Sequence, residues 1–443
     1  MAIQDAAIGY GGTFLLYGGF LLRAPEVPPP TARKWRFMFS DTTTDPRNSR
    51  WLCNTAAVQR VRSHRSRTDL SEIVRVWTPV DISAGVWDCE LYSYDARTGT
   101  MTGIADDIGY AFEYMRTDPL SSDPNDYPDW SGTAKLIGVG DLTGVTYIDG
   151  LFSGASSVTC DGDVTIDCTI PQDTSIESLF AGCSQLVTPP DLVTTGITNM
   201  SHLFDGCSSL ASIPPSLDVS SATDLSYMFN GALSLVSAPA MDTGSAVNMS
   251  HMFSDTNIYE APTYNTSRVT DMSYMFGGTT GNPNLRAIPP MDTSSVTTME
   301  GFASRCTALV SIPSSLDTSS VTTMKRMFFG ATSLASIPAL DTSRVTDMSY
   351  MFHSTAITAI PALTTQQVTN FSAMFMNCRS LLTIGQMRTD SATTVSVMFA
   401  NCENVTSGAY DMYLQLSSQS PVPSHGQCFT NCGGNSQIPA GWK

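Results

Sequence analysis

The segment DTSRVTDMSYMFHSTAITAIPAL, residues 341–363, repeats the preceding segment DTSSVTTMKRMFFGATSLASIPAL, residues 317–340, at most positions. The same pattern recurs through more than half of the chain at intervals of 23 to 28 residues, and one phenylalanine marks each copy. These phenylalanines are Phe152, Phe180, Phe204, Phe229, Phe253, Phe276, Phe302, Phe328, Phe352, Phe375 and Phe399. A period of about two dozen residues predicts a solenoid whose coils stack on a shared core.

Aligning the coils on phenylalanine indicates which positions are interior. The residue just before phenylalanine is Leu or Met in almost every coil, and the residue four places before it is apolar. The third position after it accepts only small side chains: Ala155, Cys183, Cys207, Ala232, Thr256, Thr279, Ala331, Thr355, Cys378, Cys402 and, one place late in a shifted coil, Cys306. A lone coil of this size buries too little apolar surface to offset the entropy of ordering its backbone, so each coil needs its neighbours.

The segment DTSRVTDMSYMF, residues 341–352, carries a family resemblance most clearly. It resembles the BspA-like branch of leucine-rich repeats, and especially the lipoprotein-associated repeat of mycoplasma and gut-bacterial surface proteins. The resemblance covers roughly residues 145–435. It implies a role in adhesion or host recognition through varied partners. Proteins of that family usually carry an export signal or a lipid anchor, and this sequence shows neither.

We therefore predict a mostly β protein in three parts. Residues 1–34 are an extended N-terminal arm with a Pro-rich hinge, and residues 35–130 are a small β-sandwich. Residues 131–443 are a leucine-rich-repeat-type solenoid of about 11–12 coils with a C-terminal cap. At a strand spacing of about 4.8 Å, the coils would extend over roughly 50–60 Å. The strands expected in the sandwich are residues 35–39, 73–77 and 86–92.

The apolar stretch from Ala6 to Leu22 contains five glycines, and the only charge before it is that of Asp5. A signal peptide needs a basic start and a small-residue cleavage site, which this stretch lacks. We interpret it as an arm that buries its aromatic residues in a virion protein or a sister subunit; a poor signal sequence is the alternative. The predicted anchoring residues are Tyr10, Phe14, Tyr17 and Phe20.

The formal net charge of −17 is carried mainly by the repeat region. Residues 136–443 hold 23 acidic and 9 basic residues, whereas residues 1–135 hold 17 and 14. Because an acidic surface repels polyanions, we expect neither nucleic acid nor anionic lipid as a partner of the solenoid, and protein or glycan partners fit better. The basic run from Arg60 to Arg67 is interpreted as a solvated loop, with contact to an acidic protein as the next alternative.

The chain has eleven cysteines. Six of them belong to the small-residue column and are expected to behave as small hydrophobes: Cys183, Cys207, Cys306, Cys378, Cys402 and Cys432. Disulfides between neighbouring coils, such as Cys183 with Cys207 or Cys378 with Cys402, remain an alternative. The pairs Cys160 with Cys168 and Cys428 with Cys432 lack the spacing and companion ligands of a zinc site, so we predict no metal and no cofactor.

A catalytic role of the repeats would depend on one column of acidic residues. Its members are Asp218, Asp242, Asp292, Asp317 and Asp341, with Asn265 at the same position of another coil. Aspartate at a strand-to-turn junction most simply accepts a hydrogen bond from the N–H two residues on. A polysaccharide-cleaving solenoid with paired acids is the enzymatic alternative, but no acid pair stands out from the repeat and no catalytic motif is present. We predict no catalytic residues.

The position two residues before phenylalanine is the most varied one and the richest in residue types that binding surfaces favour. We call six of its residues the candidate stripe: His202, Tyr227, His251, Tyr274, Arg326 and Tyr350. Stacked coils would align them along one flank, where they either bind a partner or only stack on one another. The insertion from Thr279 to Asn284 is a further candidate, because it lengthens its coil with turn-forming residues.

These observations favour a non-enzymatic recognition protein at a virion surface. We expect a bacteriophage fibre, tip or decoration protein, anchored by residues 1–130, that presents the solenoid to a host-surface glycan or protein. A bacterial cell-surface adhesin is the runner-up, and a purely structural virion component is the third interpretation. No membrane span is expected. The ligand and the oligomeric state stay open, with a homo-oligomer as one alternative.

Overall fold

This computed structural model describes residues 134–139, 142, 145, 148–160, 164–169 and 174–443, and before residue 105 the pairing of seven strands. The chain forms two compact units. The amino-terminal unit comprises Met1–Thr194 and Ser212–Leu217, and the repeat unit comprises Thr195–Ala211 and Asp218–Lys443. The predicted domain boundary at residues 130 and 131 differs from this division and stays a prediction.

A seven-stranded sheet dominates the amino-terminal unit. Its strands are β3 (Arg36–Asp41), β4 (Val58–Gln59), β5 (Ile73–Ser83), β6 (Val86–Asp95), β7 (Thr100–Ile104), β8 (Ala134–Val139) and β9 (Val158–Cys160). Their order is β4-β5-β6-β3-β8-β9, and β7 also pairs with β6. Strand β8 pairs with β3 antiparallel and with β9 parallel. The strands β10 (Thr165–Asp167) and β11 (Asp191–Val193) form a separate parallel pair.

The three strands predicted from alternating apolar residues are confirmed as β3, β5 and β6. The described strands make one main sheet, so the second sheet of the predicted β-sandwich is not among them, and the sandwich stays a prediction. Within residues 1–34, β1 (Phe14–Tyr17) and β2 (Phe20–Arg23) pair as an antiparallel hairpin, and the arm as a whole stays a prediction. The sequence between them is Gly18-Gly19, which favours a two-residue hairpin turn. Tyr10 lies outside the described residues.

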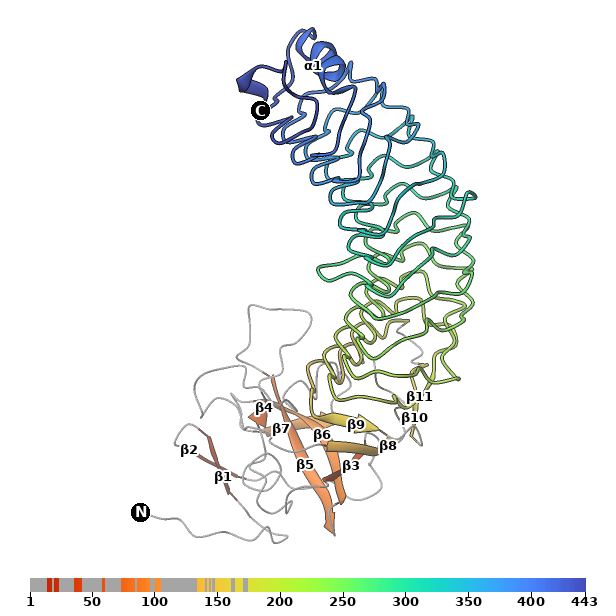
Figure 1. Ribbon diagram of the computed structural model, residues 1–443. Coiled ribbons are helices and arrows are strands. Elements are labelled where there is room, and N and C mark those ends of the chain that lie inside the picture. Colours follow the sequence, from red (N-terminus) through yellow and green to blue (C-terminus); the bar gives the residue numbers. More distant parts are fainter. Residues whose placement is uncertain are drawn as a thin grey trace. The chain divides into compact units, whose positions relative to one another are not determined.

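Successive coils of the repeat unit stack in parallel (Figure 1). Single β-bridges join residues one repeat apart, and we call these residues the bridge column: Asn199, Asp224, Asn248, Asp271, Thr298, Thr323, Asp347, Asn370, Thr394 and Ser424. Around each bridge, alternate N–H groups donate to the following coil, as from Phe352 to the carbonyl of Met374 at 2.9 Å. Most coils also hold two residues with positive φ, which interrupt the extended backbone and keep the strands of this unit short.

Phenylalanine rings form the core of the repeat unit. Nine of them are fully buried in one column: Phe204, Phe229, Phe253, Phe276, Phe328, Phe352, Phe375, Phe399 and Phe429. Except across the one interruption described next, neighbouring ring centroids lie 5.5 to 6.1 Å apart with the planes within 27° of parallel. Each ring pair contributes about 0.5–1.5 kcal/mol beyond the burial of its area. The column therefore fixes the register of the coils.

The coil of Phe302 interrupts the phenylalanine column, and the sequence alignment was wrong there. The N–H of Ala303 donates to Met327, just as that of Phe328 donates to Met351 in the next coil. Ala303 therefore occupies the ring position. Phe302 takes the preceding Leu or Met position, from which it meets Phe276 edge-on at 5.6 Å and 80°. The same one-residue shift brings Cys306 into the small-residue column.

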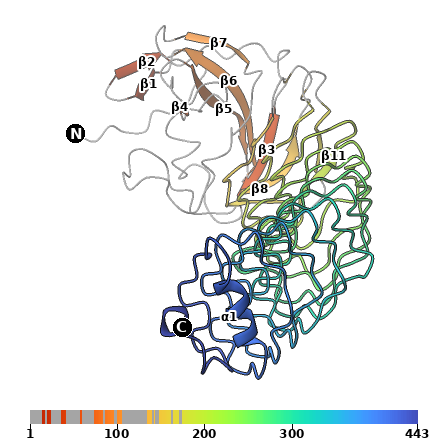
Figure 2. The same ribbon diagram turned by 90° about the horizontal axis from the view of Figure 1, so that it is seen from above.

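The last coil is covered by the C-terminal residues. The helix α1 (Ala409–Ser417) lies beside the final coils, and a 3-10 helix (Ala440–Trp442) follows Pro439 (Figures 1 and 2). The N–H of Phe429 donates to the carbonyl of Trp442 at 2.8 Å, in place of the carbonyl of another coil. The indole of Trp442 stacks on His425 at 3.8 Å and is buried. Trp442 thus closes this end of the phenylalanine column.

The shifted register is tested by making the same substitution at two phenylalanines. Phe302→Met should lower the free energy of unfolding by less than about 1.5 kcal/mol, because methionine is common at that position in other coils. Phe375→Met should cost about 1–3 kcal/mol, because it removes two ring stacks. Denaturant unfolding of both variants measures the difference. Equal losses would contradict the assignment of Ala303 to the ring position.

Candidate functional site

The structure brings the candidate stripe together on one flank of the repeat unit. All six residues share the left-handed backbone conformation, with φ between 52° and 60°. Such values are uncommon for residues other than glycine and cost free energy, so the surrounding coils must hold them in place. The N–H of His251, for example, donates to the carbonyl of Ser273 at 2.8 Å. Arg326 is exposed, and the five rings are partly buried.

Four rings of the candidate stripe stack face to face. His202 lies 4.4 Å from Tyr227, Tyr227 lies 4.2 Å from His251, and His251 lies 4.9 Å from Tyr274, with the planes within 16° of parallel. The interpretation that these residues stack on one another is therefore confirmed for these four. Since neighbours cover the inner faces, the stack offers a partner mainly ring edges, hydroxyls and nitrogens.

Both histidines of this stack lie near carboxylates. The Nδ1 atom of His202 lies 2.7 Å from Oδ2 of Asp205. Burial between two tyrosines lowers the pKa of His251, and the nearby carboxylates, chiefly those of Asp271 and Asp255, only partly oppose this effect. Below the ordinary histidine pKa of 6.5 the unfolded chain therefore takes up this proton first, and the stability that neutral His251 contributes at higher pH is lost as the pH falls.

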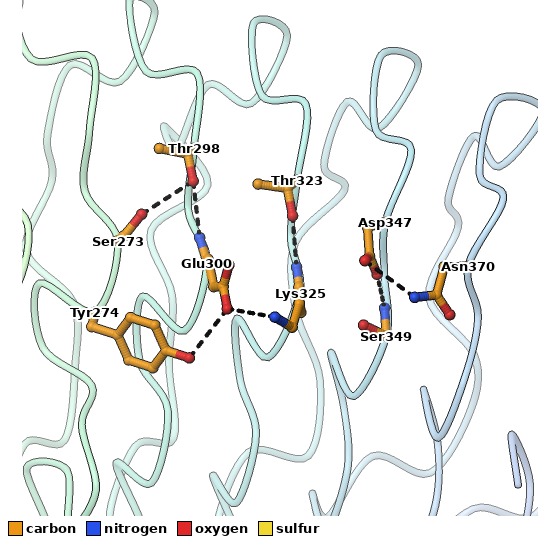
Figure 3. A network of polar contacts seen from close by, with 9 residues as sticks. All are labelled: Ser273, Tyr274, Thr298, Glu300, Thr323, Lys325, Asp347, Ser349 and Asn370. Atoms are coloured by element: carbon orange, nitrogen blue, oxygen red, sulfur yellow. Dashed lines mark hydrogen bonds and ion pairs between the residues drawn. The ribbon is translucent and has the colours of Figure 1, made fainter.

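Gly301 interrupts the candidate stripe between Tyr274 and Arg326. It has φ 59°, the same conformation as the stripe residues. A Cβ atom at this position would lie 2.2 to 2.5 Å from atoms of the Tyr274 ring. The ring of Tyr274 therefore covers the glycine, and its hydroxyl donates to Oε1 of Glu300 at 3.4 Å (Figure 3).

The bridge column runs beside the candidate stripe and carries its acids in alternation. Asp224 accepts a hydrogen bond from the side-chain amide of Asn248 in the next coil at 3.4 Å. Asp347 accepts one from that of Asn370 at 3.1 Å (Figure 3). Within this column every Asp has only Asn or Thr as its neighbours. Like charges placed directly opposite each other across strands destabilise the pairing, so the alternation avoids repulsion between coils.

A serine column separates the bridge column from the candidate stripe, except in two coils. There Glu300 and Lys325 replace serine, and Nζ of Lys325 lies 3.0 Å from Oε1 of Glu300 (Figure 3). Both side chains are about one third exposed, so the pair contributes at most about 1 kcal/mol. Its main effect is to neutralise the positive charge of Lys325, the residue before Arg326 in the chain.

The prediction that the turn aspartates cap backbone N–H groups is confirmed. Oδ1 of Asp218, Asp292 and Asp341 accepts the N–H two residues on at 2.9, 3.1 and 2.9 Å. The hydroxyl and the N–H of the following serine lower the pKa of each of these carboxyl groups. Hydrogen bonding of this kind keeps the acids ionised and accounts for their recurrence without catalysis.

Sequence reasoning missed a row of threonine hydroxyls. In six coils, the residue after the turn position is a buried threonine whose hydroxyl donates to the next coil's carbonyl at 2.6 to 2.9 Å. These residues are Thr243, Thr266, Thr293, Thr318, Thr342 and Thr365. The sequence did carry a signal for this row, because the position after the variable turn residue holds threonine in coil after coil. A buried hydroxyl needs a partner, and the stacked coil supplies one.

The alignment was also wrong in the coil of Phe276. Asn282, not Thr279, occupies the small-residue position there, and its buried amide donates to the carbonyls of Phe253 at 2.7 Å and Phe276 at 2.6 Å. Its side-chain oxygen accepts a short hydrogen bond from the hydroxyl of Thr256. The three residues from Thr279 to Gly281 are therefore an insertion.

Asp255 holds this insertion in place. One carboxylate oxygen accepts the N–H groups of Thr280 and Gly281, both at 2.7 Å, and the other accepts that of Thr279 at 3.1 Å. Burial alone would raise the pKa of Asp255, but these hydrogen bonds outweigh it and lower the pKa. The inserted residues are thus fixed by the preceding coil, and a ligand-binding role for them stays a prediction.

All nine described cysteines are buried, and none of them is in a disulfide. The thiols of Cys306, Cys378 and Cys402 donate to the carbonyls of Phe276, Phe352 and Phe375 at 3.2, 2.9 and 3.0 Å. Burial raises the pKa of Cys306 to about 12 and that of Cys378 to about 11. They act as small hydrogen-bond donors, not only as hydrophobes. The alternative of a disulfide between Cys378 and Cys402 is wrong for this structure.

Among the described residues, no three His, Cys, Asp or Glu side chains gather in a way that would hold a metal ion. Nor does any helix within these residues have the length and apolar character that crossing a membrane requires.

Comparison with known proteins places the repeats in context. The family described as Mycoplasma protein of unknown function, DUF285, matches residues 174–287, 247–358 and 309–413. A leucine-rich repeat protein from Bacteroides ovatus ATCC 8483, with a crystal structure at 1.19 Å resolution, is similar at 15% identity over 62% of this chain and 71% of that chain, with a TM-score of 0.39. No curated protein matches the chain.

The packing of Tyr274 on Gly301 is tested by adding one methyl group. Gly301→Ala must adopt a positive φ and push the Tyr274 ring aside, so it should lower the free energy of unfolding by about 1–3 kcal/mol. Gly196→Ala is the matched control, because Gly196 also has a positive φ, 82°, and its Cβ would meet nothing within 4 Å. Denaturant unfolding compares the two variants. Equal stabilities would show that Tyr274 does not lie over Gly301.

Proposed function

The chain belongs to the DUF285 family, whose matches together cover residues 174–413, and we propose that its repeat unit is a non-enzymatic recognition surface. We assign the stacked coils to the leucine-rich-repeat type, in its BspA-like branch. The parallel stacking of coils about two dozen residues long and the repeated Asp-Thr-Ser turn support this assignment.

The candidate stripe is the observation that carries the proposal. Its residues keep a costly backbone conformation in coil after coil while their side chains differ. A position that served stability alone would be expected to hold glycine, as at Gly301, or a single residue type. Variation of side chains that are at least partly exposed, on a fixed backbone, is typical of a surface that recognises a partner.

We place the protein at a virion surface, as a fibre, tip or decoration protein of a bacteriophage. The support is the combination of an adhesion-type repeat with a separate amino-terminal unit that residues Tyr10, Phe14, Tyr17 and Phe20 would anchor to a virion or sister subunit. The solenoid would face a host-surface glycan or protein. Antibody labelling of purified particles tests this location, and particles without label would count against it.

Two alternatives differ from this proposal in location or partner. A bacterial cell-surface adhesin would use the same candidate stripe but would be found in the cell-envelope fraction of its bacterium. A purely structural virion component would leave the stripe without any receptor. A polysaccharide-degrading enzyme is disfavoured, because the described turn aspartates cap backbone N–H groups.

Binding is tested with the labelled full chain on bacterial cells and on an array of surface glycans. The double variant Tyr227→Ala with Tyr274→Ala should bind at least about tenfold more weakly, since truncating central aromatic residues of an interface typically costs 2 kcal/mol or more. The matched control is Tyr259→Ala, because Tyr259 is 54% exposed and lies outside the candidate stripe.

The proposal requires the stripe variant to lose binding and the control to retain it. Equal binding by both variants and the parent chain would contradict recognition through the candidate stripe. Circular dichroism of both variants establishes that the coils remain folded.

A further inference from the structure

Two arginines and three rings form a compact cluster on the stripe flank. The guanidinium carbon of Arg305 lies 5.5 Å from the centroid of the Phe329 ring, and that of Arg326 lies 5.5 Å from the centroid of the Tyr350 ring. The two rings are 6.3 Å apart, and His353 stacks on Phe329 at 4.6 Å. We call these five residues the arginine cluster. Only Arg326 and Tyr350 belonged to the candidate stripe, since the sequence repeat does not bring Arg305 and Phe329 together.

Neither arginine of the cluster has a carboxylate partner within residues 174–443. The ion pairs in that range join His202 with Asp205, Lys325 with Glu300, Arg379 with Glu403 and Arg388 with Asp390. Both Arg305 and Arg326 are exposed. Stacking on an aromatic ring restricts a guanidinium while leaving its N–H edge free. The acidic repeat unit thus presents two positioned cations that its own acids do not neutralise.

His353 adds no charge to the cluster near neutral pH. Its Nε2 atom lies 3.3 Å from Nδ2 of Asn377, which donates to it, and its Nδ1 atom lies 2.9 Å from Oγ of Ser354. Burial lowers the pKa of His353. The imidazole therefore serves as a neutral, fixed support for Phe329, and the positive charge is that of the two arginines.

The chemistry of the cluster selects an isolated carboxylate. A guanidinium edge binds carboxylate, sulfate or phosphate through paired N–H groups. The formal net charge of −17 disfavours densely charged polymers such as nucleic acids, so singly charged groups spaced along a chain fit best. The guanidinium groups and His353 already occupy ring faces of the cluster, which leaves the arginine edges to make the contact.

The surroundings of the cluster indicate what carries that carboxylate. The neighbouring coils present partly exposed hydroxyl and amide groups, such as those of Ser372, Asn377 and Asn401, where the core of a protein interface would be apolar. We propose that Arg305 and Arg326 bind the carboxylate of an acidic polysaccharide. This inference rests on the proposed recognition function and names its ligand class.

Isothermal titration of the full chain with a galacturonate oligosaccharide tests the proposal, with the methyl ester of the same oligosaccharide as the uncharged probe. Arg305→Gln with Arg326→Gln should weaken galacturonate binding by about tenfold or more, because hydrogen bonds to charged groups are lost. The matched control, Arg268→Gln with Arg344→Gln, makes the same change in net charge at two exposed arginines of another column and should bind as the parent chain does.

A second variant keeps the test decisive if the glutamine pair folds poorly. Arg305→Lys with Arg326→Lys retains the charge but not the planar fork, so its affinity should fall between those of the parent and the glutamine variant. Each of three results would overturn the proposal: equal binding of the methyl ester, equal losses in the cluster and control variants, or binding of a polyglutamate peptide in place of the sugar. Loss of cell binding by the Tyr227 and Tyr274 variant, with no galacturonate binding, would refute this inference and leave the proposed function standing.

Discussion

The repeat unit depends on one constraint, which is that each residue lies against its equivalent in the next coil. Rings contact rings in the phenylalanine column, threonine hydroxyls donate to the next coil's carbonyls, and thiols donate to the carbonyls of the phenylalanine column. Because every interior position meets a copy of itself, only groups that interact favourably with their own kind recur there. The narrow choice of side chains in each interior column follows from this constraint.

Charged groups satisfy this constraint least well, because a column of identical charges would repel itself. The solenoid avoids such columns. In the bridge column Asn or Thr separates the aspartates, and in the serine column the two charged residues have opposite sign. Turn aspartates face outward and cap their own coil. The outer flank is less restricted, since its side chains need only lean on a neighbour. Histidine, tyrosine and arginine gather there, at a position where the backbone is fixed by hydrogen bonds on both sides.

The sequence predicted the features that depend on spacing, and it failed where spacing changes. The repeat period, the turn caps and the buried phenylalanines followed from the pattern and agree with the structure. Phe302 was misplaced because a one-residue shift in its coil puts it in the preceding Leu or Met position. Thr279 was misplaced because an insertion moves the small-residue position to Asn282, three residues later. The positive φ of the candidate stripe and the contact between Arg305 and Phe329 were not predictable, since both arise from stacking between coils and not from order along the chain.

Cross-linking of introduced cysteines tests the stacking most directly. Thr346 and Thr369 are exposed and belong to neighbouring coils, joined by a hydrogen bond of 2.9 Å from the N–H of Thr369 to the carbonyl of Thr346. Neighbouring coils spaced by about 4.8 Å bring cysteines at these positions within disulfide range, whereas Thr346 and Thr393, two coils apart, lie beyond it. We predict that Thr346→Cys with Thr369→Cys forms a disulfide on mild oxidation and that Thr346→Cys with Thr393→Cys does not. Cross-linking of the second pair but not of the first would contradict it.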